Sequence, residues 1–344
     1  MPDIAALSTG TLLGLFVAAA VVIALLGTRM AGIADALADR TGLGEALIGS
    51  VLLGAGTSIS GIVTSVSTAA SGHPELSVSN AMGGIAAQTM FLALADIAYR
   101  KVNLEHAAAS AVNLAQANIL IILVALPILA WATPPVALLG IHPLTPVLVA
   151  GYLIGLHNAH SVHRDPMWVP RSTPDTRDEA DDPEDDPHRT SVLAWSFAGL
   201  VAVVGLAGWI VGETGTLLSG RLGVSETVVG ALMTAIVTSL PELVTTTAAV
   251  RRGALQLAVG GIIGGNMFDA LFVAASDVAY RGGSIYHAVS ERTLFWFAVV
   301  LLMTAVLLMG LLRRERQGPG GIGWESVLLL TLWIGGAGLQ VALG

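Results

Sequence analysis

The stretch TSLPE, which ends at Glu242, places three oxygen-bearing side chains close together on one predicted helix. Thr238 and Ser239 precede Glu242 by four and three residues, so all three share a helix face. Pro241 has no amide hydrogen and should leave the carbonyl of Val237 without its helical donor. Hydroxyl, carbonyl and carboxylate oxygens are the ligands that hard cations such as Na⁺ and Ca²⁺ prefer. The spacing therefore indicates a cation site.

The chain around this stretch is too apolar for a soluble globular domain. Of its 344 residues, 54% are hydrophobic and only 12% are charged, which is typical of a polytopic membrane protein. The apolar runs are far longer than a barrel strand, so we expect membrane-spanning helices. Ten runs are predicted as spans, near residues 11–28, 46–71, 74–98, 107–132, 135–157, 192–211, 224–250, 254–280, 293–312 and 324–343.

Two acids lie well inside these runs, where they are expected near the centre of the bilayer. Glu242 belongs to the seventh, and Asp269 ends the motif GGNMFD in the eighth, where Gly265 on the same face lets helices approach closely. A carboxylate within hydrocarbon costs several kcal/mol unless it is paired or solvated, so both are candidate functional residues. The alternative is a carboxyl group that is protonated or hydrogen-bonded within helix packing.

The chain contains an internal repeat with an offset of 181 residues. Residues 57–100 align with residues 238–281 without a gap and share 15 identities in 44 positions. The offset pairs five predicted spans with five others, so the second copy enters the membrane from the opposite side. We therefore predict an all-α membrane protein of ten helices in two inverted five-helix repeats, as in secondary transporters. The repeats are residues 1–160 and 191–344, and residues 161–190 form an acidic linker between them.

The repeat shows that the candidate site is lopsided. Thr57 and Ser58 match Thr238 and Ser239, so the hydroxyl groups occur in both copies. Gly61 stands opposite Glu242, and Gln88 stands opposite Asp269, so both acids of the second copy are replaced by neutral residues in the first. Thr57, Ser58 and Gln88 are therefore further candidate ligands.

These motifs resemble the calcium/cation antiporter superfamily, whose members include sodium/calcium and cation/proton exchangers. The resemblance covers both halves, and TSLPE followed by GGNMFD is its most specific part. It implies that Thr238, Ser239, Glu242 and Asp269 are ion ligands faced by Thr57 and Ser58. The chain departs from the family pattern at Gly61, where a second glutamate is expected.

The sequence therefore predicts a secondary antiporter, and not an enzyme, that exchanges Ca²⁺ for Na⁺ or H⁺ through one site near the membrane midplane. The two carboxylates could balance one Ca²⁺ or two monovalent ions, which is the basis of competition. Two alternatives remain: a monovalent cation/proton exchanger, and a non-transporting protein that keeps a binding or structural role. The expected partners are inorganic cations and the lipid bilayer, with no cofactor and no nucleic acid.

Basic residues predict the orientation in a cell membrane. Thirteen of the sixteen Lys and Arg residues lie in the loops after odd-numbered spans. The positive-inside rule then places linker 161–190 in the cytoplasm and both termini outside. The first residues include an acid and no base, so we expect the first span to be retained.

The remaining signals are weaker. The chain has no cysteine, which excludes thiolate ligands and disulfides. His157, His160 and His163 could form a pH sensor or a transition-metal site, although interfacial histidines are the simpler interpretation. Asp96 and Asp277 precede Tyr-Arg at helix ends and are predicted to be interfacial anchors.

Overall fold

The structure is a computed structural model that describes residues 4–41, 48–99, 102–173, 190–318 and 321–343. Within these ranges the chain consists of helices and loops, with an isolated bridge between Leu138 and Ile141. Each predicted apolar run contains helix. The longer helices are α1 (Thr9–Val22), α2 (Thr28–Thr41), α3 (Ile48–Ala70), α4 (Pro74–Tyr99), α6 (Ala111–Trp131), α7 (Leu144–Arg164), α8 (Thr190–Leu222), α11 (Leu240–Arg252), α12 (Leu255–Asp269), α13 (Leu271–Ala279), α15 (Glu291–Arg313) and α16 (Trp324–Leu343).

Short helical segments connect or extend the long ones. They are η1 (Ile4–Ala6), the π-helices η2 (Ile23–Gly27) and η3 (Val229–Thr234), α5 (Leu104–Ala107), α9 (Glu226–Val228), α10 (Ala235–Thr238) and α14 (Ile285–Ala288). By length and apolar composition, seven helical segments of the described chain can cross a membrane, and the bent pair around Ser239 would make eight. The chain is therefore an integral membrane protein, and the count of ten spans stays a prediction.

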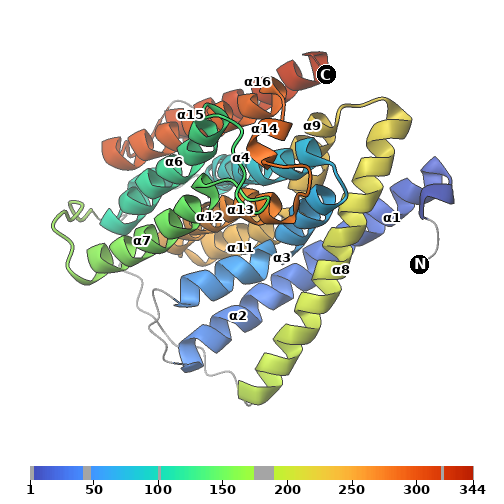
Figure 1. Cartoon of the computed structure of the whole chain (residues 1–344). Coiled ribbons are helices and arrows are strands. Elements are labelled where there is room, and N and C mark those ends of the chain that lie inside the picture. The colour runs from blue at the N-terminus through green and yellow to red at the C-terminus, as the bar shows by residue number, and fades with distance from the viewer. Residues whose placement is uncertain (1–3, 42–47, 100–101, 174–189, 319–320, 344) are drawn as a thin grey trace.

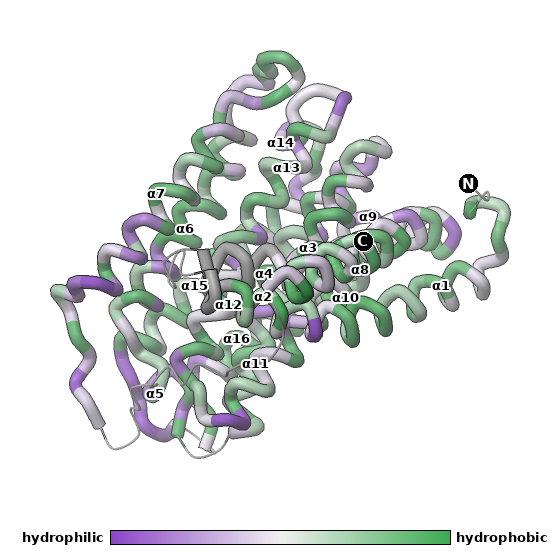
Figure 2. Tube along the Cα trace, turned by 90° about the horizontal axis from the view of Figure 1, so that it is seen from below, coloured by the Kyte–Doolittle hydropathy of each residue, from purple (hydrophilic) through white to green (hydrophobic). Residues whose placement is uncertain are grey.

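The most enclosed helices are those that carry the candidate site. The most apolar stretch of α4 is 83% buried and that of Leu255–Ala279 is 67% buried, against 22% for α8. Figure 1 shows α3, α4 and α11 to α13 in the middle of the bundle, with α1, α2 and α8 on one side and α6, α7, α15 and α16 on the other. Along these helices hydrophobic residues predominate, while hydrophilic residues gather near α5 (Figure 2).

The helix that carries TSLPE is broken at the motif. Helix α10 ends at Thr238, Ser239 has φ −96° and ψ 7°, and α11 starts at Leu240. The segments before and after the break differ in direction by 47°. Pro241 explains the break, because it lacks an amide donor and its ring clashes with the preceding turn. A Cβ at Gly27 would lie 2.6 Å from Cγ of Pro241, so only glycine lets η2 pack there.

Two buried aspartates tie the halves of the chain together by matching hydrogen bonds. Asp96 accepts from the amides of Leu104 and Gly323 at 2.8 and 3.0 Å and from Ser326 Oγ at 2.9 Å. The residues 181 positions away repeat the pattern, because Asp277 accepts from three donors of its own. These are the amides of Ile285 and His142, at 3.0 and 2.8 Å, and Thr145 Oγ1, at 2.6 Å.

The prediction that Asp96 and Asp277 are interfacial anchors is therefore wrong. Both side chains are at most 1% exposed. Each caps the start of a helix in the other half of the chain, where backbone amides lack helical acceptors. Their positions next to Tyr-Arg suggested an interface, but two of the three donors to each aspartate lie more than 130 residues away in the chain.

The boundary between the halves differs in part from the prediction. The fifth run was predicted from residue 135, yet α7 begins at Leu144, because Pro134, Pro135 and Pro143 interrupt regular helix before it. Helix α7 ends at Arg164 and α8 starts at Thr190. Most of linker 161–190 lies outside the described residues, so the division into two repeats and a linker stays a prediction.

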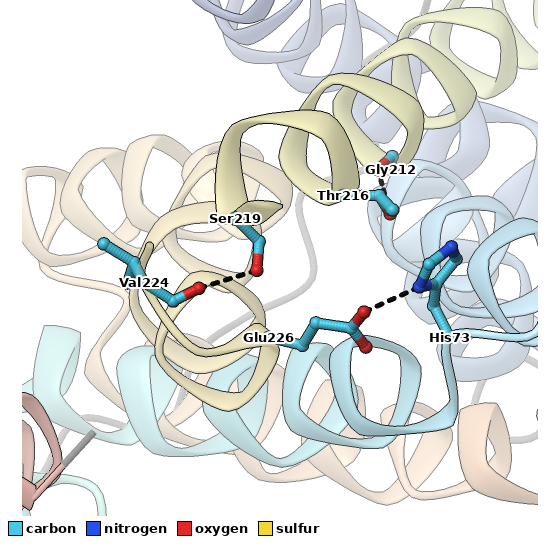
Figure 3. Close-up of polar contacts among 6 residues, drawn as sticks. All are labelled: His73, Gly212, Thr216, Ser219, Val224 and Glu226. Atoms are coloured by element: carbon cyan, nitrogen blue, oxygen red, sulfur yellow. Dashed lines mark hydrogen bonds and ion pairs between the residues drawn. The ribbon is translucent and has the colours of Figure 1, made fainter. Parts of the chain in front are cut away.

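A partly exposed ion pair joins the loop before α4 to α9. His73 Nδ1 lies 2.6 Å from Glu226 Oε1, as Figure 3 shows. Next to it, Ser219 Oγ donates to the carbonyl of Val224 at 2.6 Å and closes the turn after α8. Glu226 is thus a partly exposed acid at the periphery of the bundle, in contrast to the buried acids at its centre.

Candidate cation site

Glu242 lies in the first turn of α11, directly after the break. Its side chain is 5% exposed, and its carboxyl group lies beside the hydroxyl groups of Thr57 and Ser58 on α3. Its Oε2 atom is buried and has no hydrogen-bond partner. The break therefore delivers a carboxyl group to the centre of the bundle with one oxygen uncommitted.

Asp269 is the last residue of α12 and is 2% exposed. Ser58 Oγ donates to its Oδ1 at 2.6 Å, and Gln88 Nε2 donates to its Oδ2 at 2.6 Å. These donors come from α3 and α4, so three helices meet at this carboxyl group. Ser58 and Gln88 of the first copy thus contact an acid of the second copy.

The two copies of the repeat contact each other through corresponding hydrogen bonds of Gln88 and Asp269. Ser58 bonds to Asp269, and the residues 181 positions away repeat this contact, with Gln88 Nε2 donating to Ser239 Oγ at 3.3 Å. Gln88 and Asp269 are themselves a matched pair that bond to each other. The amide at 88 makes this possible, because it donates to a carboxylate where a second carboxylate would repel it.

Three buried acceptor oxygens remain without a hydrogen-bond donor around these residues. They are Glu242 Oε2, Gln88 Oε1 and Asn266 Oδ1, and each belongs to a side chain that is at most 5% exposed. The described residues contain no salt bridge to Glu242 or Asp269. Buried acceptors without donors are rare and costly. A cation or a proton would satisfy them.

Two predicted ligands use their polar atoms differently. Thr238 Oγ1 donates to the carbonyl of Ala235 in its own helix, although its oxygen can still accept or coordinate. Val237 lies at the break, where the amide of Ser239 turns back toward the carbonyls of residues 235–237. Their roles as ligands stay predictions, as do those of the other named residues.

The space beside Gly61 is filled by an aromatic ring. A Cβ at Gly61 would lie 2.7 Å from Cε2 of Phe272, whose ring is 3% exposed. Phe272 was not identified from the sequence as part of this region. Its identity with Phe91 in the repeat was the available signal, but that identity does not reveal a contact with α3.

The histidines at the end of α7 do not assemble a metal site. His157 and His163 are exposed, and His160 is half-buried. Within the described part of the chain, no group of three or more His, Asp or Glu residues could hold a metal ion. The central site instead offers two carboxyl groups together with neutral oxygens.

The chain belongs to the sodium/calcium exchanger protein family, whose model matches residues 11–154 and 191–342. Among curated proteins it is 32% identical over 132 residues to the inner membrane protein YrbG of Escherichia coli, covering 38% of this chain and 40% of that protein. It is 28% identical over 123 residues to the sodium/calcium exchanger MaX1 of Methanosarcina acetivorans, covering 36% of this chain and 33% of MaX1. Both alignments thus span less than half of the relative.

Solved structures share the fold over nearly the whole chain. The H⁺/Ca²⁺ exchanger CAX matches with a TM-score of 0.68 and 12% identity, covering 96% of this chain and 86% of that one. The sodium-calcium exchanger NCX_Mj matches with a TM-score of 0.57 and 19% identity, covering 95% and 97%. At these identities the likeness establishes the fold.

Proposed function

We propose that this protein is a secondary antiporter that exchanges Ca²⁺ for Na⁺ or H⁺ at one site around Glu242 and Asp269. The observation that carries the proposal is a pair of buried carboxyl groups without a salt bridge, together with three buried oxygens without a donor, one of which belongs to Glu242. A bound cation satisfies both the oxygens and the charges. The family and the exchangers that share the fold agree with this assignment.

The charge of the site gives a reason for exchange. Two ionised carboxylates carry about −2, which one Ca²⁺ or two monovalent ions would balance. Because either load neutralises the same two groups, the loads compete and cross the membrane in turn. The proposed ligands are Glu242 and Asp269, the hydroxyl groups of Thr57, Ser58, Thr238 and Ser239, the carbonyl of Val237 and the amide oxygen of Gln88.

The proposed architecture is ten spans in two inverted repeats, with the site at the midplane between them. Support comes from the offset of 181, which relates the hydrogen bonds of Asp96 to those of Asp277 and the contacts of Ser58 to those of Ser239. The proposed orientation puts residues 161–190 in the cytoplasm and both termini outside. A single cysteine at Ser172, labelled by an impermeant reagent only after the membrane is opened, would agree with it. Labelling of intact cells would contradict it.

A monovalent cation/proton exchanger is the second candidate. Phe272 favours it, because the ring fills the space beside Gly61 that another acidic ligand would need. Coulomb attraction scales with ion charge, so a site with fewer carboxylates loses more of its affinity for a divalent ion. The non-transporting alternative has no comparable support.

The test is ion flux in proteoliposomes that hold the purified protein. Uptake of Ca²⁺, Na⁺ or K⁺ is measured under imposed Na⁺ or H⁺ gradients for the wild type, Glu242→Gln and Glu226→Gln. The last variant makes the same chemical change at the peripheral ion pair. We expect a Na⁺ or H⁺ gradient to drive Ca²⁺ uptake by the wild type and Glu226→Gln, and no uptake by Glu242→Gln.

Each other outcome points elsewhere. Gradient-driven Na⁺ or K⁺ uptake without Ca²⁺ uptake would favour the monovalent exchanger. No flux of any ion through a folded wild type would favour the non-transporting alternative. Uptake by Glu242→Gln at the wild-type rate would reject the site.

A further inference from the structure

A second pair of carboxyl groups is buried away from the central site, at the end of the bundle where α5 meets the start of α16. Glu105 lies in α5 and Glu325 in the first turn of α16, and they are 1% and 0% exposed. Both converge on Gly310 of α15: a Cβ there would lie 2.8 Å from Cγ of Glu325 and 3.1 Å from Cγ of Glu105. Their carboxyl groups are near enough to share a hydrogen bond if one is protonated.

No other side chain of the described residues donates a hydrogen bond to the oxygens of this pair, although the backbone amide of each glutamate lies near its own carboxyl group. All four carboxyl oxygens of Glu105 and Glu325 are buried without a hydrogen-bond partner. Asn103, which is 1% exposed, adds a fifth such oxygen, Oδ1. The amide of Asn103 lies against the pair, because a Cβ at Gly323 would be 2.9 Å from Glu325 Oε1 and 3.4 Å from Asn103 Nδ2. Five acceptor oxygens from two segments, residues 103–105 and the first turn of α16, thus lie in one region.

Among the described residues, the salt bridges do not involve Glu105 or Glu325. Asp96 is close and negative, but its own oxygens already accept the three donors described above. Arg313 pairs with Glu315 at 3.5 Å and lies over the ring of Trp324.

The side chains of Arg314, after α15, and His106, on α5, form hydrogen bonds to backbone carbonyls and to one hydroxyl group. Arg314 donates to the carbonyls of His106 and Arg171. The ring nitrogens of His106 bond to the carbonyl of Arg314 and to Thr173 Oγ1. None of these hydrogen bonds involves the carboxyl group of Glu105 or Glu325.

The equivalent positions of the other repeat are neutral. With the offset of 181, Glu105 corresponds to Tyr286 and Glu325 to Leu144. The hydroxyl of Tyr286 bonds to Thr145 Oγ1 at 2.9 Å, so that end of the molecule is satisfied by its own side chains. The two ends share the aspartate caps, and only one of them carries uncompensated acids.

We propose that Glu105, Glu325 and Asn103 form a second cation site, separate from the central one, that binds a divalent ion of the Ca²⁺ type. Two carboxylates balance a divalent charge, and the five oxygens leave one to three of the six to eight positions around Ca²⁺ for water. A shared proton would occupy only two of the five oxygens and leave the rest without partners. A monovalent ion would leave one buried negative charge uncompensated.

Without the ion, the pair is expected to hold a proton. Burial raises the pKa of Glu105 well above its usual value of 4.5, and the negative charges of Asp96 and Glu325 raise it further. Ca²⁺ binding must displace that proton, so binding should release protons and weaken as the pH falls. This site could sense Ca²⁺ or brace α5 against α16 without carrying the ion across the membrane.

The experiment measures binding of radioactive Ca²⁺ to the purified full chain in detergent, so it does not depend on transport. Glu242→Gln/Asp269→Asn removes both acids of the central site. We expect this variant to retain one Ca²⁺ per chain and to lose it when Glu105→Gln/Glu325→Gln is added. In the same background Glu226→Gln should retain the ion.

Two outcomes would overturn the proposal: no Ca²⁺ bound by Glu242→Gln/Asp269→Asn, or binding that survives the added Glu105→Gln/Glu325→Gln. If the fourfold variant does not fold, Glu325→Gln alone in that background decides the matter. Loss of one charged ligand should weaken Ca²⁺ binding about a hundredfold, and unchanged affinity would reject the site. Failure of the flux assay would not alter any of these results.

Discussion

The two matched segments, residues 57–61 and 238–242, both start with Thr-Ser. The first lies within a continuous helix, and the second interrupts one. Helix α3 runs without a break through Thr57 and Ser58 and leaves Gly61 against the ring of Phe272. The second segment breaks at Ser239 and sends Glu242 into the bundle centre. Proline and glutamate in one copy, with serine and glycine in the other, account for the difference.

The two repeats therefore contribute different groups to the site. The second half supplies both negative charges, and the first half supplies the neutral groups that hold Asp269, namely Ser58 and Gln88. Carboxylates at both 88 and 269 would face each other at hydrogen-bonding distance and repel. The amide at 88 keeps the symmetric contact while reducing the charge of the site.

The largest expected effect on the exchange rate comes from moving the negative charge from Asp269 to position 88. Asp269→Asn should lower the exchange rate by about a hundredfold or more, because it halves the charge available to the ion. Adding Gln88→Glu restores the total charge on the other helix and should recover part of the rate. Flux in proteoliposomes measures both. If Asp269→Asn alone transports normally, the charge of the second half is not required.

The next largest effect is a loss of stability when an acid replaces Gly61. Gly61→Glu should destabilise the protein by about 3 kcal/mol or more, since the side chain collides with Phe272 and buries a further charge. Gly61→Glu/Phe272→Ala removes the collision and should regain part of the thermal stability. In the double variant Ca²⁺ should raise the melting temperature more than it does in the wild type. An unperturbed single variant would mean that Phe272 does not fill the space.

A smaller effect distinguishes the two symmetric serines. Ser58→Ala removes a 2.6 Å bond to a carboxyl group, whereas Ser239→Ala removes a 3.3 Å bond to an amide. Hydrogen bonds to charged groups contribute about 1.5–3 kcal/mol, and neutral ones about 0.5–1.5 kcal/mol. Ser58→Ala should therefore lower stability or ion affinity more than Ser239→Ala does. Equal losses in thermal and binding measurements would remove the distinction between the halves.

The smallest effect concerns Glu105, at the end where the repeats differ most. Its raised pKa means that its stabilising contribution is full below 4.5 and is lost as the pH rises through the higher folded value. Without divalent ions, the melting temperature should therefore fall as the pH rises above 4.5. Glu105→Gln should flatten that fall, while Glu226→Gln should not. A wild-type profile that Glu105→Gln leaves unchanged would count against a buried, protonated Glu105.

Part of this arrangement could be predicted because the repeat carries positional information. The offset of 181 makes Ser58 and Gln88 the counterparts of Ser239 and Asp269, and the family resemblance implies that Ser58 faces the acids. The contact of Phe272 with Gly61 could not, since it depends on how α13 packs against α3. The burial of Glu105 could not be predicted either, because it depends on how α5 packs against the start of α16. In both cases the decisive neighbour lies more than 200 residues away in the chain.

The claim that Glu242 and Asp269 hold the exchanged cation is tested most directly by Ca²⁺ binding in the Glu105→Gln/Glu325→Gln background, where the proposed second site is absent. We predict that this variant binds one Ca²⁺ per chain and that Na⁺ or a fall in pH displaces it. Adding Glu242→Gln should abolish the binding, and adding Glu226→Gln should leave it intact. Ca²⁺ binding that persists with Glu242→Gln would contradict the assignment of the site.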